Sequence, residues 1–110
     1  MPAEIVIVAQ LWVAEDKIDE IADLMRRCVE YTHEHEPSVR PFALHRDTED
    51  PLHLTMIEGF PGQPALDAHR ESQFYKELMT RLNTPGVLTR RERLVLEPLG
   101  FGEPAKGYVG

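Results

Sequence analysis

The sequence predicts a single α+β domain in which helices cover one face of an antiparallel β-sheet. Its 110 residues are enough for one domain and too few for two. Hydrophobic residues make up 42 % of the chain, a fraction typical of a globular domain with its own core. Strand-like and helix-like segments follow one another in the order β-α-β-β-α-β, which is the order of the ferredoxin-like fold.

The first strand is predicted over residues 4–13, which are rich in β-branched residues and apolar at nearly every position. A strand with one solvated face alternates apolar with polar residues, so we expect both faces of this strand to be covered. A long amphipathic helix follows. Residues 15–16 are acidic, which favours a helix start, and Pro37 ends the helix near His35.

A hairpin and a second helical region come next. Strands are predicted over residues 39–46 and 52–60, and the short polar turn between them makes an antiparallel pair. Pro64 suits a first helical turn, because its missing N–H is not needed there. Ser72 is a candidate N-cap for a second helical segment that runs through Leu82.

The last strand is predicted over residues 91–97, where leucines alternate with arginines. We therefore place the domain at residues 1–98. Residues 99–110 contain four glycines and are expected to form a C-terminal tail that is flexible or docked on a partner.

The apolar residues of the strands exceed what one layer of helices can cover. Val6 and Val8 lie on one face of the first strand, and Ile7 and Leu11 lie on the other. A second copy of the chain is the simplest cover for the face without helices, so we expect a homodimer.

Charge and cysteine content exclude several classes of protein. Twelve basic and nineteen acidic residues give a net charge of -7, which argues against nucleic-acid binding. No apolar run approaches the roughly 20 residues of a membrane helix. There is one cysteine, Cys28, and no secretory signal pattern at the N-terminus, so we expect a cytoplasmic protein.

Three short motifs follow the hairpin in a fixed order. Residues 58–60 read Glu-Gly-Phe, residues 65–69 read Ala-Leu-Asp-Ala-His, and residues 72–75 read Ser-Gln-Phe-Tyr. In this order and spacing they resemble the antibiotic biosynthesis monooxygenase domains of the dimeric α+β barrel superfamily. The resemblance extends over residues 4–98 in element order and length.

The resemblance implies a homodimer whose two sheets form a barrel, with a pocket in each subunit between sheet and helices. It also implies a cofactor-independent monooxygenase that uses molecular oxygen as co-substrate on a quinol-like or phenolic aromatic molecule. The haem-degrading members resemble one another in a tryptophan and a haem-ligating histidine, at positions that are His69 and Met79 here, so we expect no haem. Two alternatives stay open: an isomerase or lyase on the same fold, and a non-catalytic ligand-binding or stress-response dimer.

His69 and Glu58 are the candidate catalytic residues. A histidine exchanges protons near neutral pH, which suits the deprotonation of a phenol or hydroquinone. Glu58 shares an otherwise apolar strand face, where a carboxylate needs a partner or a raised pKa. It either orients His69 or binds a substrate hydroxyl, and the structural alternatives are a hydrogen bond that anchors the helix of His69 or a pairing with an arginine.

The candidate substrate-binding residues are aromatic or share a strand face with an aromatic residue: Gln10, Trp12, Met56, Phe60, Phe74 and Tyr75. Together they would line an apolar pocket suited to a flat ligand. The alternative is that the aromatic side chains belong to the core or, for Trp12, to a dimer interface.

Other polar residues are weaker candidates for a binding site. His33 and His35 lie two apart on a helix, so they point in different directions, and we expect no metal there. His45 and His53 lie on the two strands of the hairpin, and metal binding by this pair is not expected either. The basic run at Arg90, Arg91 and Arg93 either contacts an anionic ligand or forms surface ion pairs.

Overall fold

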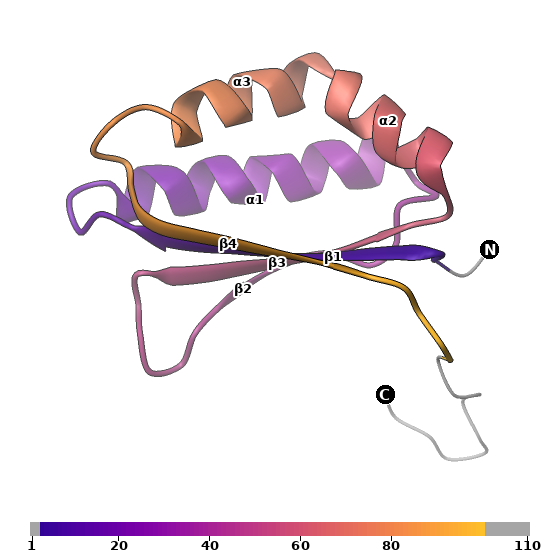
Figure 1. The fold of residues 1–110 in the computed structure, drawn as a ribbon. Helices are drawn as coiled ribbons and strands as arrows, with labels where there is room; N and C mark the ends of the chain where they lie inside the picture. Colours follow the sequence, from indigo (N-terminus) through magenta and orange to yellow (C-terminus); the bar gives the residue numbers. More distant parts are fainter. Residues whose placement is uncertain (1–2, 101–110) are drawn as a thin grey trace.

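A computed structural model describes residues 3–100 of the chain. Its elements, in chain order, are β1 (Ile5–Val13), α1 (Ile18–His35), β2 (Phe42–Arg46), β3 (His53–Phe60), α2 (Gln63–Glu71), α3 (Gln73–Leu82) and β4 (Leu88–Leu96) (Figure 1). The predicted order is confirmed. The second helical region is divided at Ser72, whose hydroxyl accepts the backbone N–H of Tyr75 at 3.2 Å, as expected of an N-cap.

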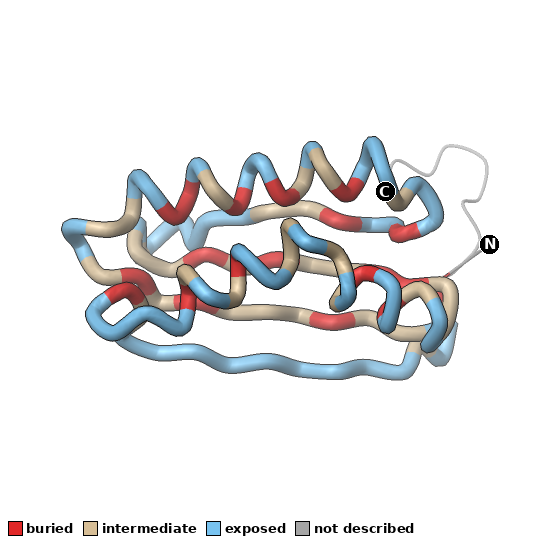
Figure 2. The backbone as a smooth tube through the Cα atoms, turned by 90° about the horizontal axis from the view of Figure 1, so that it is seen from above, coloured by how far each residue is buried: buried red, intermediate tan, exposed pale blue. Residues whose placement is uncertain are grey.

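The four strands form one antiparallel sheet in the order β2-β3-β1-β4. This is the ferredoxin-like order, as predicted. All three helices lie on the same side of the sheet, with α1 beside α3 (Figure 1). Seen from above, β4 runs along the edge and is exposed over most of its length (Figure 2).

The alternation of β1 divides the molecule into two faces. Ile7, Leu11 and Val13 face the helices and are almost fully buried. Val6 and Val8 point to the opposite face, which we call the open face, and they are only half-buried. Because side chains alternate along a strand, neighbouring residues of β1 serve different surfaces of the protein.

The core lies between the helices and the covered face of the sheet. Helix α1 contributes a buried stripe at three- and four-residue spacing that includes Ile21, Met25 and Cys28. The predicted burial of Cys28 is confirmed, and burial raises the pKa of its thiol to about 12. On the surface, an ion pair between Glu20 and Arg81 joins α1 to α3.

Some element ends differ from the sequence prediction. Helix α1 begins at Ile18 because the acidic residues before it form a turn, closed by the bond from Lys17 N–H to the Ala14 carbonyl. Strand β2 begins only at Phe42, since the preceding Pro41 has no N–H for the ladder. Strand β4 begins at Leu88, earlier than predicted, because its exposed polar residues mask the strand pattern.

The open face carries apolar side chains that no described element covers. Leu94 and Leu96 of β4 are 51 % and 44 % exposed, and they pair with Val8 and Val6 of β1. Residues 101–110, which include most of the predicted tail, lie outside the described residues. Among helices of the described residues, none combines the length and the apolarity needed to cross a membrane.

Candidate functional site

A cavity of about 380 Å³ lies between the covered face of the sheet and the three helices. This is near the lower end of the range for small-molecule sites, roughly 300–1,000 Å³. Its apolar lining comes from strands and helices alike and includes Ile7, Leu11, Met25, Met56, Leu66 and Leu78. Its polar lining includes Glu58, His69, Arg70, Tyr75, Arg91 and Arg93. The combination of an apolar floor with a few ionisable groups is typical of a ligand site.

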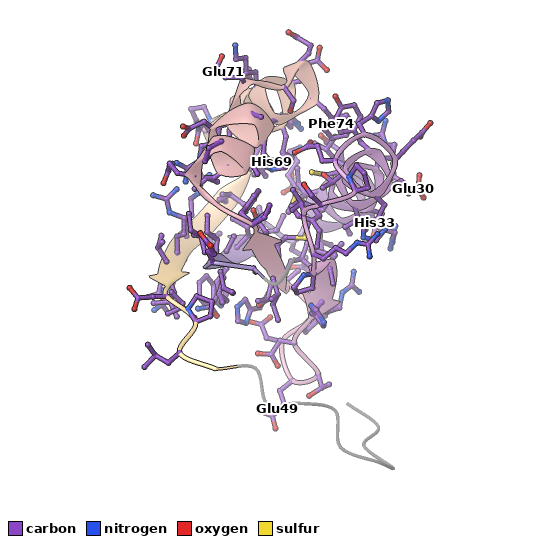
Figure 3. All side chains as sticks on the ribbon, turned by 90° about the vertical axis from the view of Figure 1, so that its right-hand side faces the viewer. Glu30, His33, Glu49, His69, Glu71 and Phe74 are labelled. Carbon is purple, nitrogen blue, oxygen red and sulfur yellow. The ribbon has the colours of Figure 1, made fainter. Side chains whose placement is uncertain are left out.

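His69 lies in the last turn of α2 and is only 3 % exposed. Its ring faces the interior, under the helix (Figure 3). The rings of Phe42, Phe60 and Tyr75 surround it, with centroids 5.2–5.3 Å away. The aromatic rings fix the imidazole in place and exclude water from most of its surface.

Glu36 fixes the orientation of the His69 ring. Its Oε1 lies 2.9 Å from Nδ1 of His69, and Glu36 itself is largely buried. When Nδ1–H of His69 donates a hydrogen bond to the carboxylate of Glu36, the lone pair of the imidazole is left on Nε2. The predicted anchoring bond from His69 to Glu58 is therefore wrong, because the partner of His69 is Glu36.

Glu36 is a site residue that no sequence motif marks. Glu36 caps the C-terminus of α1, and Pro37 follows it. The sequence shows Glu36 only as an acidic residue at the end of a helix. Its partner His69 is 33 positions away along the chain. Only the folded chain brings the end of α1 next to α2, so the two groups meet.

Glu58 lies on the covered face of β3, between Ile7 of β1 and Phe42 of β2. Burial raises the pKa of its carboxyl to about 7, although Arg70 and Arg93 act in the opposite direction. The carboxyl group can therefore exchange a proton near neutral pH within the same cavity that His69 lines.

Of the four predicted pocket residues on β3 and the second helical region, two line the cavity and two do not. Met56 and Tyr75 line the cavity. Phe60 is fully buried against the His69 ring, so it supports the wall from behind. Phe74 points toward α1, where it stacks on Tyr31 with centroids 5.1 Å apart (Figure 3).

The structure does not bring Gln10 and Trp12 to this cavity. Both lie on the open face, because the even-numbered positions of β1 point away from the helices. Trp12 stacks on His53 at 4.1 Å between centroids, and the guanidinium of Arg90 lies 4.4 Å from the Trp12 ring centre. Gln10 Oε1 lies 3.1 Å from Nε2 of His53. Their assignment to a pocket with His69 is therefore wrong.

Three of the four other histidines contact nearby protein groups. Nε2 of His33 lies 3.1 Å from the Phe42 carbonyl, and Nδ1 of His35 lies 3.1 Å from the Tyr31 carbonyl. Nδ1 of His53 is 3.1 Å from Asp47 Oδ2. Within residues 3–100, no three His, Cys, Asp or Glu side chains are grouped so that they could hold a metal ion.

The basic run on β4 is divided between the two faces of the sheet. Arg90 lies on the open face and pairs with Glu92. Arg91 and Arg93 line the cavity, and Arg91 donates to Asn83 Oδ1 at 2.7 Å. Arg90 therefore forms the predicted surface ion pair, and only Arg91 and Arg93 lie where an anionic ligand of the cavity would be within reach.

Solved structures with the same fold were found in other organisms. A conserved protein from Methanosarcina mazei Go1 is 26 % identical, with a TM-score of 0.75, over 84 % of this chain and 90 % of that one. A structure described as an antibiotic biosynthesis monooxygenase is also 26 % identical, with a TM-score of 0.76, over 87 % of this chain and 99 % of that one. Rv0793 from Mycobacterium tuberculosis is 24 % identical, with a TM-score of 0.78, over 94 % of this chain and all of that one.

Among curated proteins, none matches this chain. The family model described as antibiotic biosynthesis monooxygenase matches residues 4–81, which run from β1 nearly to the end of α3. The matched segment contains Glu36, Glu58 and His69. The chain therefore belongs to the antibiotic biosynthesis monooxygenase family.

Proposed function

We propose that this chain is a cofactor-independent monooxygenase that acts on a quinol-like or phenolic aromatic molecule. Membership of the family supports a monooxygenase in general terms. The observation that carries the finer proposal is the buried His69–Glu36 pair at the wall of an apolar cavity. It is a general base with an orienting carboxylate, placed where a flat apolar substrate would bind.

In the proposed reaction, His69 takes a proton from a substrate hydroxyl at Nε2. Glu36 holds the Nδ1–H and stabilises the imidazolium that forms. The resulting aromatic anion is electron-rich and transfers its electrons to molecular oxygen. For a hydroquinone, one oxygen atom enters the ring and the other leaves as water, so that hydroquinone and O₂ give a hydroxyquinone and water. The substrate supplies all the electrons, and no other reductant is needed.

Glu58 is proposed as a second proton site. With its pKa raised to about 7, the carboxyl is protonated in a large fraction of molecules at neutral pH. A protonated carboxyl donates a hydrogen bond, so it can hold a substrate oxygen while His69 removes a proton elsewhere on the ring. Met56 and Tyr75 would contact the body of the ligand.

We also propose that a second copy of the chain covers the open face. The support is the half-exposed apolar patch of Val6, Val8, Leu94 and Leu96 on a sheet that is covered by helices on its other side. An apolar sheet face of this kind is most stable when it packs on another sheet. The Trp12–His53 stack lies on the same face and would border that interface.

The reaction is tested by oxygen uptake with a panel of hydroquinones and naphthols. We expect His69→Ala to lower kcat by about 100-fold or more, which is the usual contribution of a general base. His45→Ala is the matched control, because His45 is an exposed histidine on β2 whose side chain points to the open face. Equal rates for wild type and His69→Ala on every substrate would exclude His69 as the base.

Glu36 is a positioning residue, and it needs a test of its own. Glu36→Gln should lower kcat by roughly 10-fold with little change in KM, because the amide no longer favours the Nδ1–H tautomer. The pH dependence of kcat should change with it, which a purely structural loss would not cause. Product formation without oxygen uptake would overturn the monooxygenase in favour of an isomerase or lyase.

A further inference from the structure

Positive charge gathers at the cavity of an acidic protein. The whole chain has a formal net charge of -7, yet three arginines line this one cavity. Arg70 comes from α2, and Arg91 and Arg93 come from β4. Two acidic residues also line the cavity, but Glu92 is paired with Arg90, so Glu58 is the one that faces the arginines.

The three arginines differ in their contacts. Arg91 is held by Asn83 and by the sulfur of Met79, at 2.7 and 3.1 Å. Arg70 and Arg93 make neither a hydrogen bond nor an ion pair with any side chain of residues 3–100. Both act on the charge of Glu58 from a distance, without reaching ion-pair contact with it. Two guanidinium groups on different elements therefore border one cavity with their donors available to a ligand.

We propose that the substrate of this cavity is an aromatic acid whose carboxylate is bound by Arg93 and Arg70 while its rings lie on the apolar floor. A guanidinium binds a planar carboxylate through two parallel hydrogen bonds, which gives both affinity and orientation. Such a contact would fix which ring position faces His69. The proposal rests on the proposed function only in taking this cavity as the substrate site.

Glu58 modulates this binding. An ionised Glu58 competes with the ligand carboxylate for the same arginines, and a neutral one does not. An acidic ligand should therefore bind more weakly as the pH rises through about 7, where Glu58 loses its proton. The groups that face Glu58 are Arg70 of α2 and Arg93 of β4, together with the buried Cys28 thiol of α1. His69 also lines the cavity.

The test compares two probes of nearly the same shape, the anion 2-naphthoate and its neutral amide, 2-naphthamide. Binding to the full chain is measured by calorimetry. We expect the naphthoate to bind at least about 10-fold more tightly, which is the effect of one charged hydrogen-bonded contact. Arg93→Gln and Arg70→Gln should each remove most of this preference and leave the amide unchanged. Arg93→Lys should restore part of it.

Arg90→Gln is the matched control, because Arg90 lies on the same strand and points to the open face. Glu58→Gln should strengthen naphthoate binding above pH 7 and abolish its pH dependence. The proposal is overturned if the wild type binds both probes equally or binds neither. It is also overturned if Arg93→Gln weakens the binding of both probes to the same extent. None of these binding measurements requires turnover. If the oxygen-uptake experiment failed, they would still test the arginine site separately from the proposed reaction.

Discussion

The two faces of the sheet use the same strands for different purposes. The covered face carries ionisable groups in an apolar surrounding: Glu58, His69 from the helix above it, and Arg93 at the edge. The open face carries an apolar patch beside a stacked arrangement of Arg90, Trp12 and His53. Adjacent residues of a strand, such as Leu94 and Val95, point to opposite faces of the sheet and so belong to different surfaces. Whether a residue lies at an odd or an even position therefore matters more for its role than how far along the strand it lies.

The largest effect on stability is expected where Arg40, in the segment before β2, lies against β3. Gly59 lies on β3, and a Cβ there would be 2.2 Å from the carbonyl oxygen of Arg40. Backbone cannot move aside as a flexible side chain does, so Gly59→Ala should lower the free energy of unfolding by about 3 kcal/mol.

Gly62→Ala is the control for this substitution, because its nearest neighbours lie at ordinary contact distance, 3.6 Å or more. Urea denaturation of both variants makes the comparison. Equal stabilities would show that the carbonyl of Arg40 does not lie against Gly59.

The second effect concerns the proposed dimer. Leu94→Asp places a charge in the apolar patch and should weaken self-association by about 100-fold, measured by sedimentation equilibrium. Val95→Asp is matched to it, since Val95 is 57 % exposed and Leu94 51 %, on opposite faces of the same strand. If both variants dissociate alike, or if wild type is a monomer, the open face is not the interface.

The third effect is a pH dependence that belongs to the covered face. The pKa of Glu58 is raised in the folded protein, from 4.5 to about 7, so the folded state holds its proton more firmly than the unfolded state. Ionisation of Glu58 therefore costs stability as the pH rises from about 4.5 through 7.

Glu58→Gln removes this cost. Allowing for partial solvent access to the cavity, it should stabilise the protein by about 2 kcal/mol near pH 9 and by nothing near pH 4. Thermal unfolding across this range measures the difference. A constant difference between variant and wild type at all pH values would contradict the raised pKa.

The smallest effect returns to the open face. Arg90→Ala removes the guanidinium from the Trp12 ring and should destabilise the fold by about 0.5 kcal/mol. At about pH 5, where Glu58 keeps its proton, Arg93→Ala should have no measurable effect on stability, because Arg93 makes no hydrogen bond or ion pair within residues 3–100. If Arg93→Ala lowered the stability more than Arg90→Ala, Arg93 would have a structural role and Arg90 would not.

Much of the fold could be predicted from the sequence, because local patterns specify it. The helical spacing of α1, the cap at Ser72 and the alternation in β3 each act through near neighbours, and each element is found where it was expected, within a few residues. The first residues of β4 do not show a strand pattern in the sequence. An edge strand buries few side chains, so its positions do not need to be apolar.

The site could be predicted only in part. His69 and Glu58 both line the cavity, and such residues stand out in a sequence as polar groups among apolar ones. The misplacement of Gln10 and Trp12 has a physical reason: β1 is apolar on both faces, so its pattern does not say which face the helices cover. Glu36 could not be found, because its contact with His69 joins residues 33 positions apart and depends on the tertiary fold.

The Glu36–His69 contact has a consequence for the tolerated length of α1. Glu36 is the residue on which this helix ends, so its direction depends on the number of residues between the first turn and Pro37. Each residue of an α-helix turns the chain by about 100°. A one-residue insertion or deletion in the solvent-facing middle of α1 would thus rotate the carboxylate away from the imidazole, although every residue of the site is retained. Among related chains, we expect the length of this helix to vary less than the length of the loops around it.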